Sequence, residues 1–250
     1  MDLGLAGRAA IVTGGSRGVG KAIAQELARE GVDVVICARQ RGALDESARE
    51  LAQATGRRII PVPADTTSWE SVSRLVETAL TELGRIDILV NNASTPGGLV
   101  RGALAEADEG ELMEDINTKV VGYFRCAKAV APHMQQRGWG RIINIGGLSG
   151  RRTGVISGLR NAAIVHLTKT LADQLGPHGI TVNLVHPGAT RTERTTEEAA
   201  RRAGQSNAIR RMVEAQEIGQ VATFLASTKA AAITGIAIDA SGGSIPVVFQ

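Results

Sequence analysis

The sequence predicts an α/β protein, a doubly wound parallel seven-stranded sheet of the Rossmann type in a single domain over residues 1–250. A length of 250 residues suits one large domain. Short runs rich in Val and Ile alternate with longer segments of helical periodicity. The short runs are apolar throughout, which is typical of parallel strands covered on both faces. We therefore expect right-handed crossovers and helices on both faces.

The expected strands are seven apolar runs: Ala9–Val12, Val32–Cys37, Arg58–Val62, Ile86–Asn91, Arg141–Ile145, Ile180–Val185 and Ile233–Ile238. Between them, apolar residues recur three or four positions apart, as one face of a helix requires. The expected helices are Val19–Glu30, Leu44–Thr55, Trp69–Leu83, Leu112–Gln136, Ser157–Leu175 and Ala208–Ala226. The expected strand order is 3-2-1-4-5-6-7. Residues 189–212 follow a strand end, and we expect this segment to cover a substrate.

Composition excludes several function classes. The net charge is only +3 and is spread along the chain, so no basic stripe indicates a nucleic-acid partner. Cys37 and Cys126 form no CxxC pair, which fits a reducing compartment. No apolar run approaches the ~18 residues that span a bilayer. We expect a cytoplasmic protein with a small-molecule substrate, no membrane partner and no metal.

The strongest local signal is a glycine-rich turn between the first expected strand and helix. Its residues include Gly14, Ser16, Arg17, Gly18, Val19 and Gly20. Glycines let the backbone turn tightly and approach a pyrophosphate, and free N–H groups at the helix start bind the anion. The second strand is followed by Arg39, where an enzyme specific for NAD carries an acidic residue. Arg17 and Arg39 can bind a 2′-phosphate, so we predict NADP(H) rather than NAD(H).

Several motifs in the same order resemble those of the short-chain dehydrogenase/reductase family. They are the glycine-rich turn, Ala64-Asp65, Asn91-Asn92-Ala93-Ser94, Asp115-Ile116-Asn117, the segment from Asn183 to Gly188, and the segment from Ile238 to Gly243. The resemblance implies a homotetramer or homodimer, paired through the helices Leu112–Gln136 and Ser157–Leu175. It also implies further cofactor-binding residues: Asp65, Thr66, Asn91, Ala93, Asn161, Pro187, Gly188, Thr190 and Thr192.

The catalytic motif departs from this family. The family uses a Tyr, a Lys four residues later, an upstream Ser and a supporting Asn. The resemblance places Asn117 at the Asn position but Ser157, Asn161 and Gly147 at the other three. Tyr123, the sole tyrosine, lies on another helix, where we interpret it as a packing residue.

The expected consequence is slow reduction of ordinary ketones, because loss of a positioned general acid costs roughly 10²–10⁴-fold in rate. Ser149 is a candidate to replace the missing catalytic serine, and we predict that it is catalytic together with Asn117, Ser157 and Asn161. Weaker candidates for a role in catalysis are Arg151, Arg152, Arg160 and His186. The favoured function is an oxidoreductase acting on a carbonyl, alcohol or enone. The alternative is a non-redox protein on the same fold: a cyclase or isomerase, a cofactor-binding sensor, or an inactive partner subunit.

Overall fold

The computed structural model describes residues 1–100 and 102–245 of the chain. These residues form a parallel seven-stranded sheet in the order β3-β2-β1-β4-β5-β6-β9, which confirms the predicted order. The strands are β1 (Ala9–Thr13), β2 (Asp33–Ala38), β3 (Ile59–Pro63), β4 (Ile88–Asn91), β5 (Gly140–Ile145), β6 (Ile180–Pro187) and β9 (Ala237–Ala240). Observed strand boundaries lie within two residues of the predicted ones, except at β9, which begins four residues later than expected.

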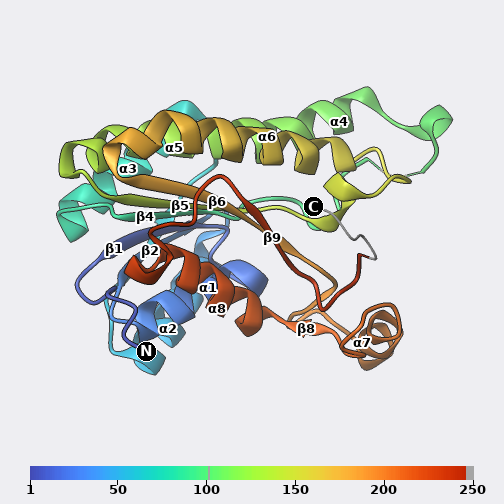
Figure 1. Cartoon of the computed structure of the whole chain (residues 1–250), viewed down its shortest axis with the longest axis horizontal. Helices are drawn as coiled ribbons and strands as arrows, with labels where there is room; N and C mark the ends of the chain where they lie inside the picture. Colours follow the sequence, from blue (N-terminus) through green and yellow to red (C-terminus); the bar gives the residue numbers. More distant parts are fainter. Residues whose placement is uncertain (101, 246–250) are drawn as a thin grey trace.

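Helices cover both faces of the sheet (Figure 1). One layer holds α1 (Gly18–Arg29), α2 (Arg41–Thr55) and α8 (Ala215–Ala226). The opposite layer holds α3 (Trp69–Leu83), α4 (Glu109–Ile116), α5 (Gly122–Arg137) and α6 (Gly158–Leu175). Within the described part of the chain, no helix is long and apolar enough to cross a membrane.

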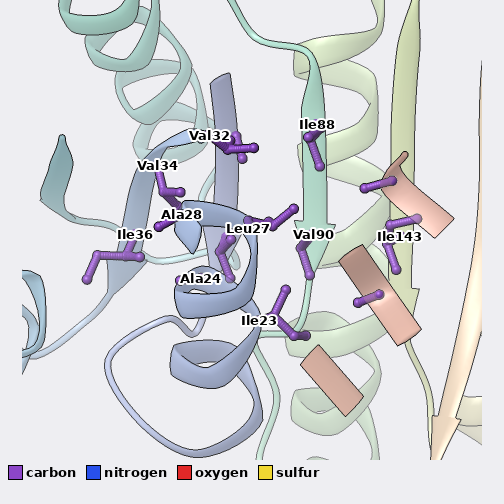
Figure 2. Close-up of a cluster of buried hydrophobic side chains, with 14 of the residues drawn as sticks. Ile23, Ala24, Leu27, Ala28, Val32, Val34, Ile36, Ile88, Val90 and Ile143 are labelled. Carbon is purple, nitrogen blue, oxygen red and sulfur yellow. The ribbon is translucent and has the colours of Figure 1, made fainter. Parts of the chain in front are cut away.

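Alternate residues of each strand point to opposite layers, which explains why the strands are apolar on both faces. Figure 2 shows Ile23 and Leu27 of α1 facing Val34 of β2, Val90 of β4 and Ile143 of β5. The intervening strand residues enter a second cluster under α3 and α5, which includes Ile11, Val35, Leu89 and Ile142. The two clusters fix the sheet between the helical layers, and the strand ends are therefore held at defined positions.

The predicted helix Leu112–Gln136 is interrupted. Helix α4 ends at Ile116, and Asn117–Val121 forms a π-helical turn before α5 begins. A π-turn adds one residue to a helical turn, and such insertions are frequent at functional sites. All residues after this turn are rotated relative to a regular helix, and Lys119 lies within it.

The segment before α8 also differs from the prediction. Residues 208–214 are not helical; β8 (Val213–Glu214) pairs with β7 (Thr190–Arg191), and α8 begins only at Ala215. Helix α7 (Glu197–Gly204) lies between these two strands and projects from the sheet beside β8 (Figure 1). Thr196 caps α7 by accepting a hydrogen bond from the Ala199 amide, a local signal typical of a helix start. The predicted covering segment 189–212 thus contains a short helix and a strand.

Candidate active site

One cavity of about 820 Å³ lies at the carboxyl ends of the central strands. Its walls come from the β1–α1 turn, the ends of β2 and β3, and the loops after β4, β5 and β6. Ligands of doubly wound sheets bind at this edge, where the strand order reverses. Sixteen of the predicted site residues line it: Gly14, Ser16, Arg17, Gly18, Val19, Gly20, Arg39, Asp65, Thr66, Ala93, Ser149, Asn161, Pro187, Gly188, Thr190 and Thr192.

The glycine-rich turn is held too tightly for side chains at two positions. Gly14 has φ +66°, in the left-handed region that favours glycine. A Cβ atom on Gly20 would lie 2.2 Å from the Gly14 carbonyl oxygen and 2.4 Å from Asn92 Nδ2. The contact with the Gly14 carbonyl oxygen is not relieved without moving the backbone of the turn. The glycines are therefore required for the turn itself.

The loop after β4 fixes the turn by hydrogen bonds. Thr13 Oγ1 accepts bonds from the amides of Asn92 and Ala93, at 2.9 and 3.0 Å. Asn92 Nδ2 donates to the carbonyl oxygens of Thr13 and Gly14, at 3.0 and 3.1 Å. Asn91 is buried below the cavity, where its Nδ2 donates to Asn144 Oδ1 at 2.9 Å. The cofactor-binding role predicted for Asn91 stays a prediction, and in this structure the Asn91 side chain joins β4 to β5.

The start of α1 offers an anion site. Its first turn contains no acidic side chain, yet the Gly18 amide donates to Glu193 Oε2 at 3.2 Å. Glu193 comes from the segment after β7, 175 residues along the chain, and its carboxylate lies where an anionic ligand would bind. Helix N-termini bind phosphates through such free amides. Together with the glycine turn, this contact fits a dinucleotide pyrophosphate.

Arg17 and Arg39 both line the cavity and are exposed. Neither forms an ion pair among the described residues, so both guanidinium groups are available to a ligand phosphate. Asp65 lies at the end of β3, where its Oδ1 accepts bonds from the Thr67 amide and hydroxyl. These contacts orient the Asp65 carboxylate at the wall that neighbours Arg39.

Three of the positions singled out in the sequence, Gly147, Ser149 and Asn161, lie close together. Gly147 lies two residues after the end of β5, and a Cβ atom there would lie 2.9 Å from Asn161 Nδ2. Asn161 on α6 therefore fills the space that a serine at position 147 would need. Asn161 Nδ2 donates to Ser149 Oγ at 2.7 Å, which brings Ser149 into the site.

Two predicted catalytic residues lie off the cavity wall formed by the described residues. Ser157 is buried, and its hydroxyl donates to the Gly97 carbonyl oxygen at 3.3 Å. The Asn117 side chain accepts a bond from Arg125 Nη1 at 2.9 Å. The catalytic roles of Asn117 and Ser157 remain predictions, and in this structure both side chains have partners elsewhere.

Lys119 was not predicted, although it lies two residues after Asn117. It is buried, lines the cavity, and its Nζ donates to Asn161 Oδ1 and to the Gly146 carbonyl oxygen, each at 2.8 Å. Burial, and to a smaller extent the charge of Arg160, lowers the pKa of Lys119 to about 7. The Asp115 carboxylate acts in the opposite direction. An ammonium group thus reaches the site from the π-turn rather than from α6.

Tyr123 and His186 have structural contacts. The Tyr123 hydroxyl donates to the Ile145 carbonyl oxygen at 2.9 Å, and burial raises the pKa of Tyr123. This confirms its interpretation as a packing residue. His186 is fully buried, its Nδ1 accepts the Gly147 amide at 3.0 Å, and burial lowers the pKa of its imidazole. His186 is therefore neutral at physiological pH and supports the turn after β5.

The weaker arginine candidates are engaged in contacts of their own. Arg160 Nη1 pairs with Asp115 at 2.6 Å in a buried ion pair, and its Nη2 donates to the Thr95 carbonyl oxygen at 3.0 Å. Arg151 pairs with Asp239 at 2.6 Å. Among the described residues, no group of three or more His, Cys, Asp or Glu side chains could hold a metal ion.

Comparison with known proteins gives consistent matches over nearly the whole chain. A family model described as enoyl-(acyl carrier protein) reductase matches residues 14–244. A 3-oxoacyl-(acyl-carrier-protein) reductase of Pseudomonas aeruginosa is 37% identical over 249 residues, covering 96% of this chain and 98% of the relative.

Solved structures match over a similar share of the chain. L-sorbose reductase from Gluconobacter frateurii, complexed with NADPH and L-sorbose, superposes with a TM-score of 0.92 at 30% identity, covering 99% of this chain and 100% of that chain. YwfH, an NADPH-dependent reductase of bacilysin biosynthesis, gives a TM-score of 0.89 at 29% identity, with coverage of 96% and 99%.

Proposed function

Because this chain belongs to the short-chain dehydrogenase/reductase family, we propose that it is an NADP(H)-dependent oxidoreductase with an atypical active site. Its substrate is a carbonyl compound, an alcohol or an enone. The main support for this proposal is that one cavity is lined both by the glycine-rich turn and by Ser149, Asn161 and Lys119. When bound, the nicotinamide cofactor donates or accepts a hydride.

The preference for NADP(H) rests on charge at the end of β2. Arg39 follows Ala38 there, and Arg17 faces the same cavity from the glycine turn. Two guanidinium groups bind a 2′-phosphate through charge-assisted hydrogen bonds. Two solved relatives are described as an NADPH complex and an NADPH-dependent reductase, which supports this choice.

Other residues are assigned by their places on the cavity wall. The amides at the start of α1 hold the pyrophosphate, and Asp65 with Thr66 contacts the adenine end. Asn161 binds ribose hydroxyls, and Pro187, Gly188, Thr190 and Thr192 enclose the nicotinamide end. Residues 189–212 contribute the last two together with Glu193 and Arg194, which supports a covering role for this segment.

One observation favours a second candidate function. Gly147, Ser157 and Asn161 replace the family's Ser, Tyr and Lys, and Ser157 is turned toward Gly97. A protein with this site can bind the cofactor without reducing a carbonyl, as a sensor or an inactive partner subunit does. The two candidates differ in hydride transfer and share cofactor binding.

Calorimetry with NADPH and NADH tests the cofactor assignment. We expect at least several-fold tighter binding of NADPH, and Arg39→Ala should remove most of this preference. Arg41→Ala is the matched control, because Arg41 pairs with Asp45 on α2 and lies outside the cavity wall. Equal affinity for both cofactors would refute the assignment to NADP(H).

Absorbance at 340 nm then separates the two candidates. The purified protein is incubated with NADPH and a panel of ketones, aldehydes, β-keto thioesters and enones. Oxidation of NADPH that depends on one member of the panel supports the oxidoreductase. Tight NADPH binding with no oxidation across the panel favours the sensor or inactive subunit.

We also propose that the chain forms a homotetramer or homodimer through α5 and α6. Three large apolar side chains on these helices are exposed: Phe124, Leu159 and Val165. Exposed apolar surface of this kind is typical of protein interfaces.

A further inference from the structure

We propose that Lys119 is the proton donor of this active site and that Asn161 positions it. The inference rests on the proposed oxidoreductase function. Lys119 Nζ is fixed by Asn161 Oδ1 and the Gly146 carbonyl oxygen, both 2.8 Å away. Asn161 stands at the position where the family carries its lysine. The ammonium group is therefore restored at nearly the same place, from the π-turn between α4 and α5 instead of from α6.

The contacts of Lys119 are unlike those of a structural lysine. A buried ammonium that serves only stability is normally paired with a carboxylate. The two hydrogen-bond acceptors of Lys119 are neutral oxygens, and the nearby Asp115 is paired with Arg160 at 2.6 Å. The third N–H of Lys119 is left for a ligand, and the residue lies on the cavity wall. A buried charge kept at a cavity without a carboxylate partner indicates a functional role.

Asn161 links Lys119 to Ser149. Its Oδ1 accepts from Lys119, so its Nδ2 is directed toward Ser149 Oγ, 2.7 Å away. Ser149 Oγ therefore accepts from Asn161, and its own proton is free to bond a carbonyl oxygen. Lys119 and Ser149 are thus hydrogen-bonded to the oxygen and the nitrogen, respectively, of the Asn161 side-chain amide. A substrate oxygen beside this amide receives a hydrogen bond from Ser149 and a proton from Lys119.

Proton transfer from Lys119 accompanies hydride transfer. In the reduction direction, the carbonyl carbon receives the hydride and the π electron pair moves onto the oxygen. This oxygen forms an O–H bond as one N–H bond of Lys119 breaks, and the electron pair stays on Nζ. The neutral amine then takes a proton from water. In the oxidation direction, the neutral amine accepts the hydroxyl proton.

The surroundings tune Lys119 for this task. The charged and titratable groups that act on it or face it come from four elements: Asp115 on α4, Tyr123 on α5, Arg160 on α6 and His186 on β6. Burial and Arg160 lower the pKa of Lys119 to about 7. A general acid is most effective when its pKa lies near the working pH.

Nuclear magnetic resonance of lysine labelled at Cε tests the charge state without any substrate. The chain contains five lysines, Lys21, Lys119, Lys128, Lys169 and Lys229, so few signals need assignment. One signal should titrate near pH 7 and disappear in Lys119→Met. Lys128→Met is the control, because Lys128 is exposed on the same helical path. A Lys119 signal that titrates near 10 overturns the proposal.

Kinetics with the carbonyl that gives the highest rate tests the proton transfer. We expect Lys119→Met to lower kcat/KM at least 100-fold, with the NADPH affinity within threefold of wild type and Lys128→Met unchanged. Wild-type kcat/KM for reduction should fall above about pH 7. Asn161→Asp should move this fall to higher pH, because a carboxylate beside Nζ favours the ammonium form.

The outcomes separate this inference from the proposed function. If wild type oxidises NADPH with a carbonyl and Lys119→Met does so at the same rate, the role of Lys119 is wrong and the oxidoreductase stands. If wild type binds NADPH and reduces nothing in the panel, the oxidoreductase is wrong. A pH profile unchanged by Asn161→Asp contradicts the positioning role of Asn161.

Discussion

Replacing Lys119 by Met is expected to change the pH dependence of folding stability in a defined direction. Burial lowers the pKa of Lys119 from 10.5 to about 7 in the folded chain. Between these two values, the unfolded state binds more protons at Lys119 than the folded state does. The contribution of Lys119 to the free energy of unfolding therefore becomes more favourable as the pH rises through this window, and below pH 7 its full penalty is present.

The magnitude follows from the two pKa values. Integrating the proton difference from pH 7 to pH 9 gives a gain of about 2 kcal/mol for wild type. Lys119→Met has no such group and should be more stable than wild type at pH 7. Its advantage should shrink by about 2 kcal/mol by pH 9. Met has a similar length and leaves the volume filled, so cavity formation contributes little.

Urea unfolding at pH 6, 7, 8 and 9 measures this difference for wild type, Lys119→Met and Lys128→Met. The difference between wild type and Lys128→Met should stay constant across the series. A difference between wild type and Lys119→Met that is equally constant would show that Lys119 is not held with a lowered pKa. The role of Lys119 as a proton donor near neutral pH would then be wrong.

Three further predictions concern the turn, the catalytic positions and the assembly. Gly20→Ala should abolish NADPH binding in calorimetry, because its Cβ would lie 2.2 Å from a carbonyl oxygen of the turn. The control Gly42→Ala should bind NADPH normally, because a Cβ at this position on α2 would meet no atom within 4 Å. Asn161→Lys restores the family's lysine, yet it should lower the reduction rate measured at 340 nm, because a second ammonium would face Lys119; faster reduction would contradict this. Leu159→Arg should shift light scattering from oligomer toward monomer, because Leu159 is exposed on α6; an unchanged mass would place the interface elsewhere.

Much of the fold was predictable because burial dictates it. The strands of a parallel sheet are covered on both faces, so runs such as Val34–Ile36 are apolar throughout and stand out in the sequence. The π-turn at Asn117–Val121 was not predictable, because apolar periodicity continues across it. Residues 208–214 continue the helical pattern of α8, but 208–211 form turns and bends, and Val213 and Glu214 pair with β7.

The cofactor side of the site was predictable for a different reason. Glycine is required wherever a Cβ would meet backbone, so Gly14 and Gly20 leave a signal in the sequence. Lys119 left only a weak signal in the sequence, because its role depends on its distance to Asn161 on another helix. One feature of the sequence could have indicated it: Lys119 lies two residues after Asn117, and the other residues of Asn117–Val121 are uncharged. A functional residue that lies on a different helix from its counterpart in the family is recognised only when the three-dimensional positions of the helices are known.

We propose that this protein transfers hydride between NADP(H) and a carbonyl without the family's Tyr and Lys, and deuterium labelling tests this claim. The protein is incubated with NADPH carrying two deuterium atoms at C4 of the nicotinamide ring and with the carbonyl panel, and the products are analysed by mass spectrometry. We predict an alcohol or saturated product one mass unit heavier than with ordinary NADPH, formed by wild type and strongly reduced in Lys119→Met. Tight binding of the labelled cofactor with no deuterium in any product would contradict the claim.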